Sequence, residues 1–493
     1  MLFNSYDFIL VFLPAVLAAA FMLRGLARRW LELLLIFVSL LFYAWWDVRY
    51  VPLLAGSLLI NYVGALFIEK TRLRLALAGI ICFNLGLLIY FKYLSFFSQI
   101  ASNALPWQPW DVTLLGLVLP LGISFWTFHQ IGYQIDRWRG QASKHDFIDY
   151  AVFVTFFPQL IAGPIVRQYE FLPQLQGLAA RLSSRNVLIG LTIFSIGLFK
   201  KVIFADTFAL YATPVFDAAG KGVMLDGQVA WLGVLAYAFQ IYFDFSGYSD
   251  MAIGLARMVG IDLPINFNAP YRSTSITDFW RGWHITLGRF LRDYLYFPLG
   301  GSRVGPLHQF ANLLFVMLLC GLWHGAAWTF VLWGGLHGLA LAVHRLWLRL
   351  FPSDHPRGVL WRTGAWGVTF GFVVVMWVFF RADSLQTAMS MLQSMFSLSF
   401  FGATNVAGLE KAAIFQAWLA ILIALAWVLL APTTQELMRI VMRSPMYTPY
   451  IERSPALLPR WQPTPAWAMG SATIFAVAFL GLSRVTEFIY YNF

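Results

Sequence analysis

The chain has 493 residues, of which 60% are hydrophobic and 12% are charged, and its net charge is +11. This composition excludes an ordinary soluble enzyme, in which about a quarter of the residues are charged, and a disordered protein, which needs low hydrophobicity. Apolar segments separated by short basic loops predict instead an all-α polytopic membrane protein with about 11–12 transmembrane helices.

The first apolar segment, residues 8–23, is interpreted as a retained membrane span. An acidic residue but no basic one precedes it, so the basic region that begins a signal peptide is missing. The loop after it carries Arg24, Arg28 and Arg29. Basic loops stay on the cytoplasmic side of a membrane, so this loop is predicted inside and the N-terminus outside.

The alternation continues along the chain. Further spans are predicted near 31–46 and 51–68, up to Tyr90, up to Arg137, and near 187–203, 229–247, 309–325, 328–347, 363–380, 413–431 and 467–483. This topology places all but eight of the 34 basic residues inside, and the eight are Arg49, Lys92, Lys200, Lys201, Lys221, Arg381, Lys411 and Arg484. About twelve crossings put both termini outside, whereas the Pro-rich loop 432–466 is expected inside.

Residues 147–166 do not form a simple span. They are apolar, but Pro158, Gly163 and Pro164 interrupt them, and inner loops flank them on both sides. Irregular backbone at membrane depth is tolerated only where protein or a watered cavity surrounds it. We therefore expect a re-entrant hairpin.

Two carboxylates follow at the inner end of the span near 229–247. Asp244 and Asp250 lie in apolar surroundings, where a charge needs a partner. Arg257 or the arginines between 272 and 292 are the expected partners. The prediction is a structural polar role.

Residues 264–306 are too polar to cross a membrane and too aromatic for a solvated loop, so we expect helices that lie in the cytoplasmic interface. If residues 278–293 form one helix, one face carries Trp280, His284, Leu287 and Leu291. The same helix would carry a stripe of Arg281, Arg289 and Arg292 on another face. Such a stripe suits either anionic lipid headgroups or the phosphates of a cytosolic donor such as acetyl-CoA.

The strongest candidate for chemistry is His324, which lies between two apolar runs with Gly321 and Gly325 beside it. An imidazole suits general base catalysis near neutral pH, and the glycines leave room for a substrate. The alternative is a hydrogen bond between helices. His337 should lie on the next helix, where a structural role is expected. His, Cys, Asp and Glu do not cluster at metal-ligand spacing, so no metal is expected.

At these residues the chain resembles the membrane-bound O-acyltransferases (MBOAT), and most of all their bacterial branch of the alginate O-acetyltransferase membrane-subunit type. The matching stretches are 42–46, 119–124, 157–164, 242–254, 266–271, 283–284, 291–296, 299–301, 321–325 and 488–493. The sequence departs at Gly282, where Arg is expected, at Thr286, where Ser is common, and at Gln159, which replaces a His of some relatives.

The resemblance implies membrane helices around a central funnel and tunnel, in one domain over 1–493. Its parts would be N-terminal helices at 1–146, a catalytic core at 147–350 and C-terminal helices at 351–493. His324 would be catalytic together with His284. Donor binding would fall on Arg281, Arg289, Arg292, Trp283, Trp323, Asn268 and Asp293, and structural polar roles on Asp244, Asp250 and His337.

The resemblance also implies an O-acetyltransferase of the bacterial inner membrane, which takes an acetyl group from cytosolic acetyl-CoA and binds no cofactor. The acceptor would be a serine of an extracytoplasmic SGNH-hydrolase-like acetyltransferase, which works with polysaccharide-secretion machinery to acetylate an alginate-type exopolysaccharide. From the topology alone, the outer segments 98–112 and 402–411 are expected to dock this partner. Membrane lipids are expected to contact the chain, and no nucleic acid is expected to bind it.

Several alternatives remain. The same chemistry would serve cellulose, peptidoglycan or a cell-surface lipid. D-alanyl transfer to teichoic acid fits less well, because it needs a carrier-protein donor. A secondary transporter would account for the broken helices, but the sequence has no visible internal repeat. A scaffold in a secretion complex would leave His324 without a role.

Overall fold

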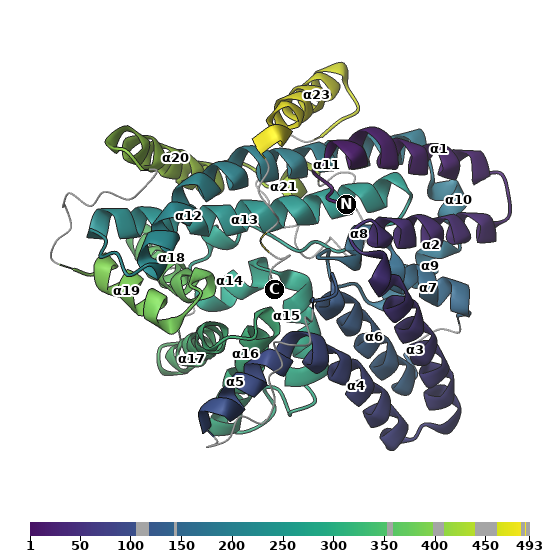
Figure 1. Cartoon of the computed structure of the whole chain (residues 1–493), viewed down its shortest axis with the longest axis horizontal. Coiled ribbons are helices and arrows are strands. Elements are labelled where there is room, and N and C mark those ends of the chain that lie inside the picture. The colour runs from purple at the N-terminus through teal and green to yellow at the C-terminus, as the bar shows by residue number, and fades with distance from the viewer. Residues whose placement is uncertain are drawn as a thin grey trace.

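The computed structural model describes residues 1–104, 118–141, 145–352, 358–397, 409–438, 461–484 and 489 (Figure 1). Helices form the regular structure of these residues, so the all-α class is confirmed. The predicted outer segments 98–112 and 402–411, the loop 432–466 and the terminal motif 488–493 lie largely outside the described residues.

Most of the N-terminal helices gather on one side of the molecule, and α5 extends away from them toward the opposite side (Figure 1). They are η1 (Phe8–Phe12), α1 (Leu13–Leu23), α2 (Arg28–Ala44), η2 (Val48–Tyr50), α3 (Val51–Thr71), α4 (Arg74–Leu88), η3 (Ile89–Tyr93), α5 (Leu94–Ala104) and α6 (Ile123–Trp138). η1 and η3 are π-helical turns that continue directly into α1 and α5.

The predicted interruption of 147–166 is confirmed. The segment and its continuation form α7 (Phe147–Thr155), α8 (Phe157–Leu160), α9 (Gln168–Leu175) and α10 (Leu178–Arg181). Phe156 leaves helical geometry at φ −47° and ψ 108°, directly before the turn that contains Pro158. Residues 161–167 are not helical, and nearly all of this stretch is buried. Protein therefore surrounds the irregular backbone, as membrane depth requires.

One helical run crosses the whole molecule beside a second long helix (Figure 1). The run consists of α11 (Ser184–Phe199), the π-helical turn η5 (Lys200–Ala205) and α12 (Asp206–Gly220), and the second helix is α13 (Gly227–Met258). The backbones almost touch, since a Cβ atom on Gly197 would lie 2.5 Å from the carbonyl oxygen of Gly247. Small residues at such crossings are typical of membrane helix pairs.

The prediction that a short span ends at Lys200 and Lys201 is wrong, because the helix continues to Gly220. Both lysines turn toward α13 instead of marking a loop. Lys200 lies 2.6 Å from Asp250, and Lys201 lies 2.7 Å from Asp244 and 2.8 Å from Asp206.

The expected arginine partners of the two carboxylates are therefore also wrong. Arg257 pairs with Asp262. Asp250 accepts further hydrogen bonds from Thr434 and Gln435 of α21 (Thr434–Met438), so these ion pairs also fasten the C-terminal part of the chain.

The segment after α13 contradicts the prediction of one helix over 278–293. It forms η6 (Pro270–Arg272), α14 (Ile276–Gly282), α15 (Ile285–Leu291) and η7 (Arg292–Tyr296). Trp283 is extended, and His284 is left-handed at φ 43°, so the chain turns sharply between α14 and α15. Trp280, His284, Leu287 and Leu291 therefore share no helical face, and the arginine stripe does not form.

The remaining helices complete the bundle. They are α16 (Pro306–His324), α17 (Trp328–Leu350), α18 (Val359–Arg381), α19 (Leu385–Met395), α20 (Lys411–Leu430), α23 (Pro465–Leu480) and η8 (Gly481–Arg484). α16 and α17 cross at Gly321 and Gly334, where a Cβ atom on Gly334 would lie 2.2 Å from the carbonyl oxygen of Met317.

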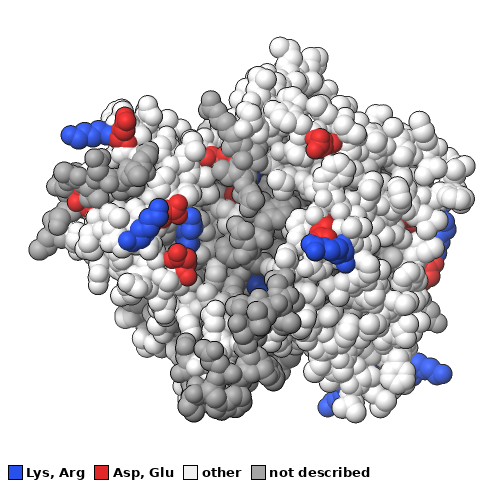
Figure 2. Space-filling view, in the orientation of Figure 1, with Lys and Arg blue, Asp and Glu red and all other residues white. Residues whose placement is uncertain are grey.

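Eight helices of the described residues are long and apolar enough to cross a membrane, and eight of the twelve predicted spans fall on them. The four other predicted spans fall on Phe8–Leu23, α2, α6 and α17, which are shorter or more polar. The face in Figure 2 carries only scattered charges among uncharged residues. Exposed apolar side chains such as Leu360, at 91%, belong in contact with lipid.

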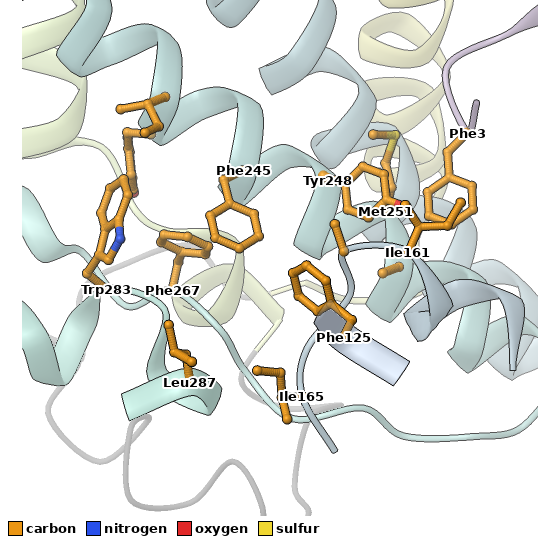
Figure 3. Packing of buried hydrophobic residues seen from close by; sticks show 14 of the residues in the cluster. Phe3, Phe125, Ile161, Ile165, Phe245, Tyr248, Met251, Phe267, Trp283 and Leu287 are labelled. Atoms are coloured by element: carbon orange, nitrogen blue, oxygen red, sulfur yellow. The ribbon is translucent and has the colours of Figure 1, made fainter. Parts of the chain in front are cut away.

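The centre of the molecule is aromatic. Figure 3 shows Phe245 of α13 close to Phe267 and Trp283, with Leu287 of α15 below them. Phe267 and Trp283 meet edge to face at 5.1 Å between ring centroids, and Trp283 also packs on Trp377 of α18 at 4.9 Å. This packing holds the turn between α14 and α15 against α13.

Candidate active site

His324 is the last residue of α16. The helix ends there because Gly325 is extended, at φ −162° and ψ 148°. The imidazole is 2% exposed. Its ring centroid lies 4.9 Å from that of Trp323, 5.2 Å from that of Trp333 and 5.2 Å from that of Phe380. The sequence thus places an imidazole inside a buried group of packed aromatic rings, which we call the aromatic chamber.

The second predicted histidine reaches the same place from a different segment. The ring of His284 lies 6.4 Å from that of His324, and Trp323 contacts both histidines. Phe245 packs on the other side of His284 at 4.7 Å. The two residues predicted to be catalytic are therefore neighbours, and Trp323, predicted to bind the donor, lies against both.

A close backbone contact sets the position of His284. The Asn268 amide donates to the carbonyl of Gly282, and the Ile285 amide donates to the carbonyl of Asn266, at 2.9 Å each. A Cβ atom on Gly282 would lie 2.7 Å from the carbonyl oxygen of Asn268. The glycine that replaces the expected Arg thus fits a place where this backbone leaves no room for a side chain.

Asn266 determines which ring nitrogen of His284 carries the proton. Its Oδ1 accepts from the Thr286 amide at 3.3 Å and from the Thr286 hydroxyl at 2.9 Å, and it lies 3.2 Å from His284 Nδ1. A backbone amide can only donate, so the shared atom is an acceptor and Nδ1 carries the proton. The Nε2 atom then presents a lone pair, and no donor from the described residues reaches it.

Asn266 was not among the predicted site residues, although it lies in a matched motif. The prediction named Asn268 instead, whose backbone amide contributes to the turn. Spacing alone does not distinguish the two asparagines. The distinguishing signal is the left-handed backbone at His284, which appears only in three dimensions.

Burial controls the charge of His284. The residue is fully buried and belongs to the segment that connects the candidate membrane spans 227–258 and 306–324. Burial lowers the pKa of His284 to about 3. The ring is therefore neutral at physiological pH, and in this state its Nε2 accepts hydrogen bonds.

His337 lies behind the chamber. Trp280 donates its indole N–H to His337 Nδ1 at 3.2 Å, and the ring of Trp333 lies between His337 and His324, at 4.8 Å and 5.2 Å respectively. His337 thus supports an aromatic wall of the chamber. Its structural role stays a prediction.

The three predicted donor-binding arginines each pair with a carboxylate. Arg281 is exposed and pairs with Asp278, Arg289 pairs with Glu170, and Arg292 pairs with Asp293. Asp293 also binds Arg167. Burial alone would raise the pKa of Asp293, but the hydrogen bonds from Arg292 and Arg167 outweigh it and lower this pKa.

A surface cavity of about 850 Å³ lies at this ion-pair group. Its lining residues are Asp136, Arg139, Gln141, Arg167, Tyr169, Asp293, Tyr294, Phe297 and Pro298. The guanidinium groups of Arg139 and Arg167 each lie 5.5 Å from the ring of Tyr294. Sequence reasoning treated both arginines only as topology signals and missed this arrangement.

A smaller and more enclosed cavity adjoins this one. A second cavity of about 10 Å³, enough for one water molecule, shares Asp136, Arg167 and Tyr294 with the first and also touches His129 and Thr286. Thr286 binds Asn266, which holds His284. Polar groups therefore extend from the arginine-lined surface to His284.

Residues 133–382 match the membrane-bound O-acyltransferase (MBOAT) family. A peptidoglycan O-acetyltransferase of Helicobacter pylori is 45% identical over 436 residues, which cover 81% of this chain and 80% of that protein. A probable alginate O-acetylase of Pseudomonas aeruginosa is 41% identical over 436 residues, which cover 85% and 81%. A teichoic acid D-alanyltransferase of Streptococcus thermophilus is 29% identical over 46% of this chain and 57% of its own length.

Proposed function

The chain belongs to the membrane-bound O-acyltransferase family and is a multi-pass membrane O-acyltransferase, and we propose that it passes an acetyl group from acetyl-CoA to a hydroxyl across the membrane. The observation that carries this proposal is the pairing of His324 and His284, at 6.4 Å between ring centroids, inside one aromatic chamber. The named relatives all transfer acyl groups, which argues against a transporter or a scaffold.

In the proposed reaction His324 acts as the general base. It takes the proton of the acceptor hydroxyl while the hydroxyl oxygen attacks the thioester carbonyl of acetyl-CoA. The carbon–sulfur bond then breaks, and the CoA thiolate leaves with the proton that His324 received. The lone pair on His284 Nε2 accepts a hydrogen bond from a reacting group and positions it.

On the donor side we place the CoA phosphates in the arginine-lined cavity. Arg139 and Arg167 line it directly, and arginine binds phosphate through paired N–H donors. These two residues replace the predicted stripe of Arg281, Arg289 and Arg292. The thioester then extends toward Thr286, Asn266 and His284, which requires the cavity of about 10 Å³ at Thr286 to widen when the donor binds.

On the acceptor side, a serine of an SGNH-hydrolase-like partner receives the acetyl group. The partner then passes this group on to an alginate-type exopolysaccharide. The similarity to the probable alginate O-acetylase of Pseudomonas aeruginosa supports alginate as the final acceptor. Peptidoglycan is the second candidate, because the peptidoglycan O-acetyltransferase of Helicobacter pylori is 45% identical. Recovery of labelled acetyl groups in purified alginate or in peptidoglycan, with the partner present, separates the two.

We further propose that the chain lies in a bacterial inner membrane with both termini on the periplasmic side. The distribution of basic loops supports this orientation. Lys92, Lys200 and Lys201 give no information on topology, because each binds a residue of another helix rather than lying in a loop.

The test of catalysis uses proteoliposomes that contain the full-length chain and labelled acetyl-CoA, with or without a candidate periplasmic partner. His324→Ala should slow release of free CoA by at least about 10²-fold, the usual contribution of a general base. His308→Ala is the matched control, because His308 is exposed on the same helix. Release at the wild-type rate from His324→Ala would overturn the assignment. No release from wild type with the partner present would overturn acetyl-CoA as the donor.

A further inference from the structure

The last turn of α16 is held by two neighbouring residues of another helix. Tyr93 donates its hydroxyl to the carbonyl of Leu322 at 2.8 Å. Lys92 donates from Nζ to the carbonyl of Trp323 at 2.5 Å and to that of His324 at 3.3 Å. We name these two residues the carbonyl clasp.

The clasp completes the hydrogen bonding at this helix end. The last four carbonyls of an α-helix have no partner within the helix itself. Here the Gly325 amide donates to the carbonyl of Gly321 at 3.3 Å, and the clasp satisfies the other three. Unsatisfied carbonyls are costly in a membrane interior, so the clasp is a strong local restraint.

A π-helical turn allows the adjacent residues Lys92 and Tyr93 to bind the same helix end. Lys92 and Tyr93 lie in the π-helical turn η3, whose wider turn changes the direction of the side chains. The third donor of Lys92 points to Ser124 Oγ on α6, at 3.4 Å. Its ammonium group also lies 5.9 Å from the ring of Trp323. A cation at a helix C-terminus is electrostatically favourable.

We propose that Lys92 and Tyr93 are positioning residues for acyl transfer, which hold the His324 end of α16 in its reacting geometry. The inference rests on the proposed function of His324. Figure 1 shows α5, which continues η3, beside α16. The clasp thus joins the N-terminal helices to the segment that carries the base.

The kinetic test compares variants in the proteoliposome assay with acetyl-CoA. Lys92→Met keeps the length of the side chain but removes its donors and charge, and it should lower kcat by about 10²-fold with KM changed less than about twofold, because displacement of a reacting group affects turnover more than binding. Tyr93→Phe should lower kcat by about fivefold, the usual effect of one hydrogen bond. Lys92→Arg keeps charge and donors and should restore part of the lost rate.

The matched control is Tyr90→Phe, because Tyr90 lies in the same π-helical turn but is 44% exposed. It should keep the wild-type kcat. Unchanged kcat in Lys92→Met would overturn the clasp, and so would a loss that appears only in KM. If His324→Ala kept full activity, the proposed function would fail instead, so the two failures are distinguishable.

A second measurement needs no turnover. The enclosed imidazole of His324 should react several-fold faster with diethyl pyrocarbonate in Lys92→Met than in wild type, because the released helix end exposes the ring. Mass spectrometry of the peptide that contains His324 gives this rate. Equal rates in the two proteins would overturn the clasp even if acetyl-CoA proved to be the wrong donor.

Discussion

His284 holds a backbone conformation that few side chains favour. Its left-handed φ of 43° costs on the order of 1–3 kcal/mol for a residue other than glycine. The hydrogen bonds of Asn266 and the packing of Phe245 and Trp323 maintain it. The site therefore stores strain at a residue that faces the candidate base, a frequent property of functional sites.

The buried histidine makes folding sensitive to acid. An ordinary histidine has a pKa of 6.5, and burial lowers the pKa of His284 to about 3, so the folded state prefers the neutral ring. This contribution is complete above pH 6.5 and is lost progressively as the pH falls toward 3. By about pH 5 the loss is about 2 kcal/mol.

His284→Asn should remove that acid sensitivity, since asparagine tolerates left-handed backbone but does not titrate. The measurement is the decline in melting temperature between about pH 7.5 and pH 5 in detergent. The decline should be smaller in His284→Asn than in wild type, whereas His308→Asn should behave as wild type. The same decline in all three proteins would contradict the prediction.

Asn266 offers a separate test of the orientation of His284. Asn266→Leu removes the acceptor that fixes the Nδ1 proton, and we expect it to lower kcat/KM by about tenfold or more, the scale of a lost hydrogen bond to a positioned group. Thr286→Ser keeps the hydroxyl that binds Asn266 and should retain most activity. Comparable activity in Asn266→Leu and wild type would remove Asn266 from the site.

At the scale of secondary-structure elements, the sequence predicted the helices more accurately than the points where a helix is interrupted. Apolar runs identified the long spans, since hydropathy alone determines them. The turn at Trp283 and His284 escaped notice, because a 3.6-residue pattern continues across it and only tertiary contacts with Asn266 and Asn268 impose it. The predicted face of Trp280, His284, Leu287 and Leu291 failed for this reason.

The crossing of α16 and α17 should not tolerate a methyl group. A Cβ atom on Gly334 would lie 2.2 Å from the carbonyl oxygen of Met317. We expect Gly334→Ala to destabilise the protein by about 1–3 kcal/mol, as overpacking does, and to lower activity by moving the helix that ends at His324. Thermal unfolding in detergent and CoA release measure the two effects.

Gly371→Ala is the control for this prediction. Gly371 lies on α18, and nothing surrounds the position of its missing Cβ within 4 Å. This variant should keep wild-type stability and activity. If Gly334→Ala matched it in both measurements, the close crossing would not control the site.

At the scale of the whole molecule, the predicted orientation has a direct test in cells. Val48 and Leu73 are 66% and 53% exposed at opposite ends of α3. In a Cys82→Ser background, a cysteine at position 48 should react with a membrane-impermeant maleimide in intact spheroplasts. A cysteine at position 73 should react only after lysis. The reverse pattern would invert the topology.

The contacts between distant parts of the chain were the feature that the sequence predicted least well. Residue spacing does not reveal which distant charges meet, so Lys200 and Lys201 appeared to be loop residues and their aspartates appeared to need arginines. His324 and His284 could be selected as candidates from the sequence because each lies in a short motif. Their meeting, and the contribution of Lys92 from an early helix, depends on packing between segments far apart in the chain.

The ion pairs between the two longest helical runs also affect how the chain enters the membrane. Lys200 and Lys201 belong to the first run, and Asp244 and Asp250 belong to the second. A lone charge at the centre of an inserting helix costs about 2.5–3.5 kcal/mol at the translocon. Lys201 has Asp206 within the first run, but Lys200 finds its carboxylate, Asp250, only on the second. The two runs follow one another directly, so delivery of 184–258 as one helical hairpin pairs Lys200 with Asp250 during synthesis. In a cell-free insertion assay, 184–220 alone should therefore integrate less efficiently than 184–258, and the order of the chain serves biogenesis as well as catalysis.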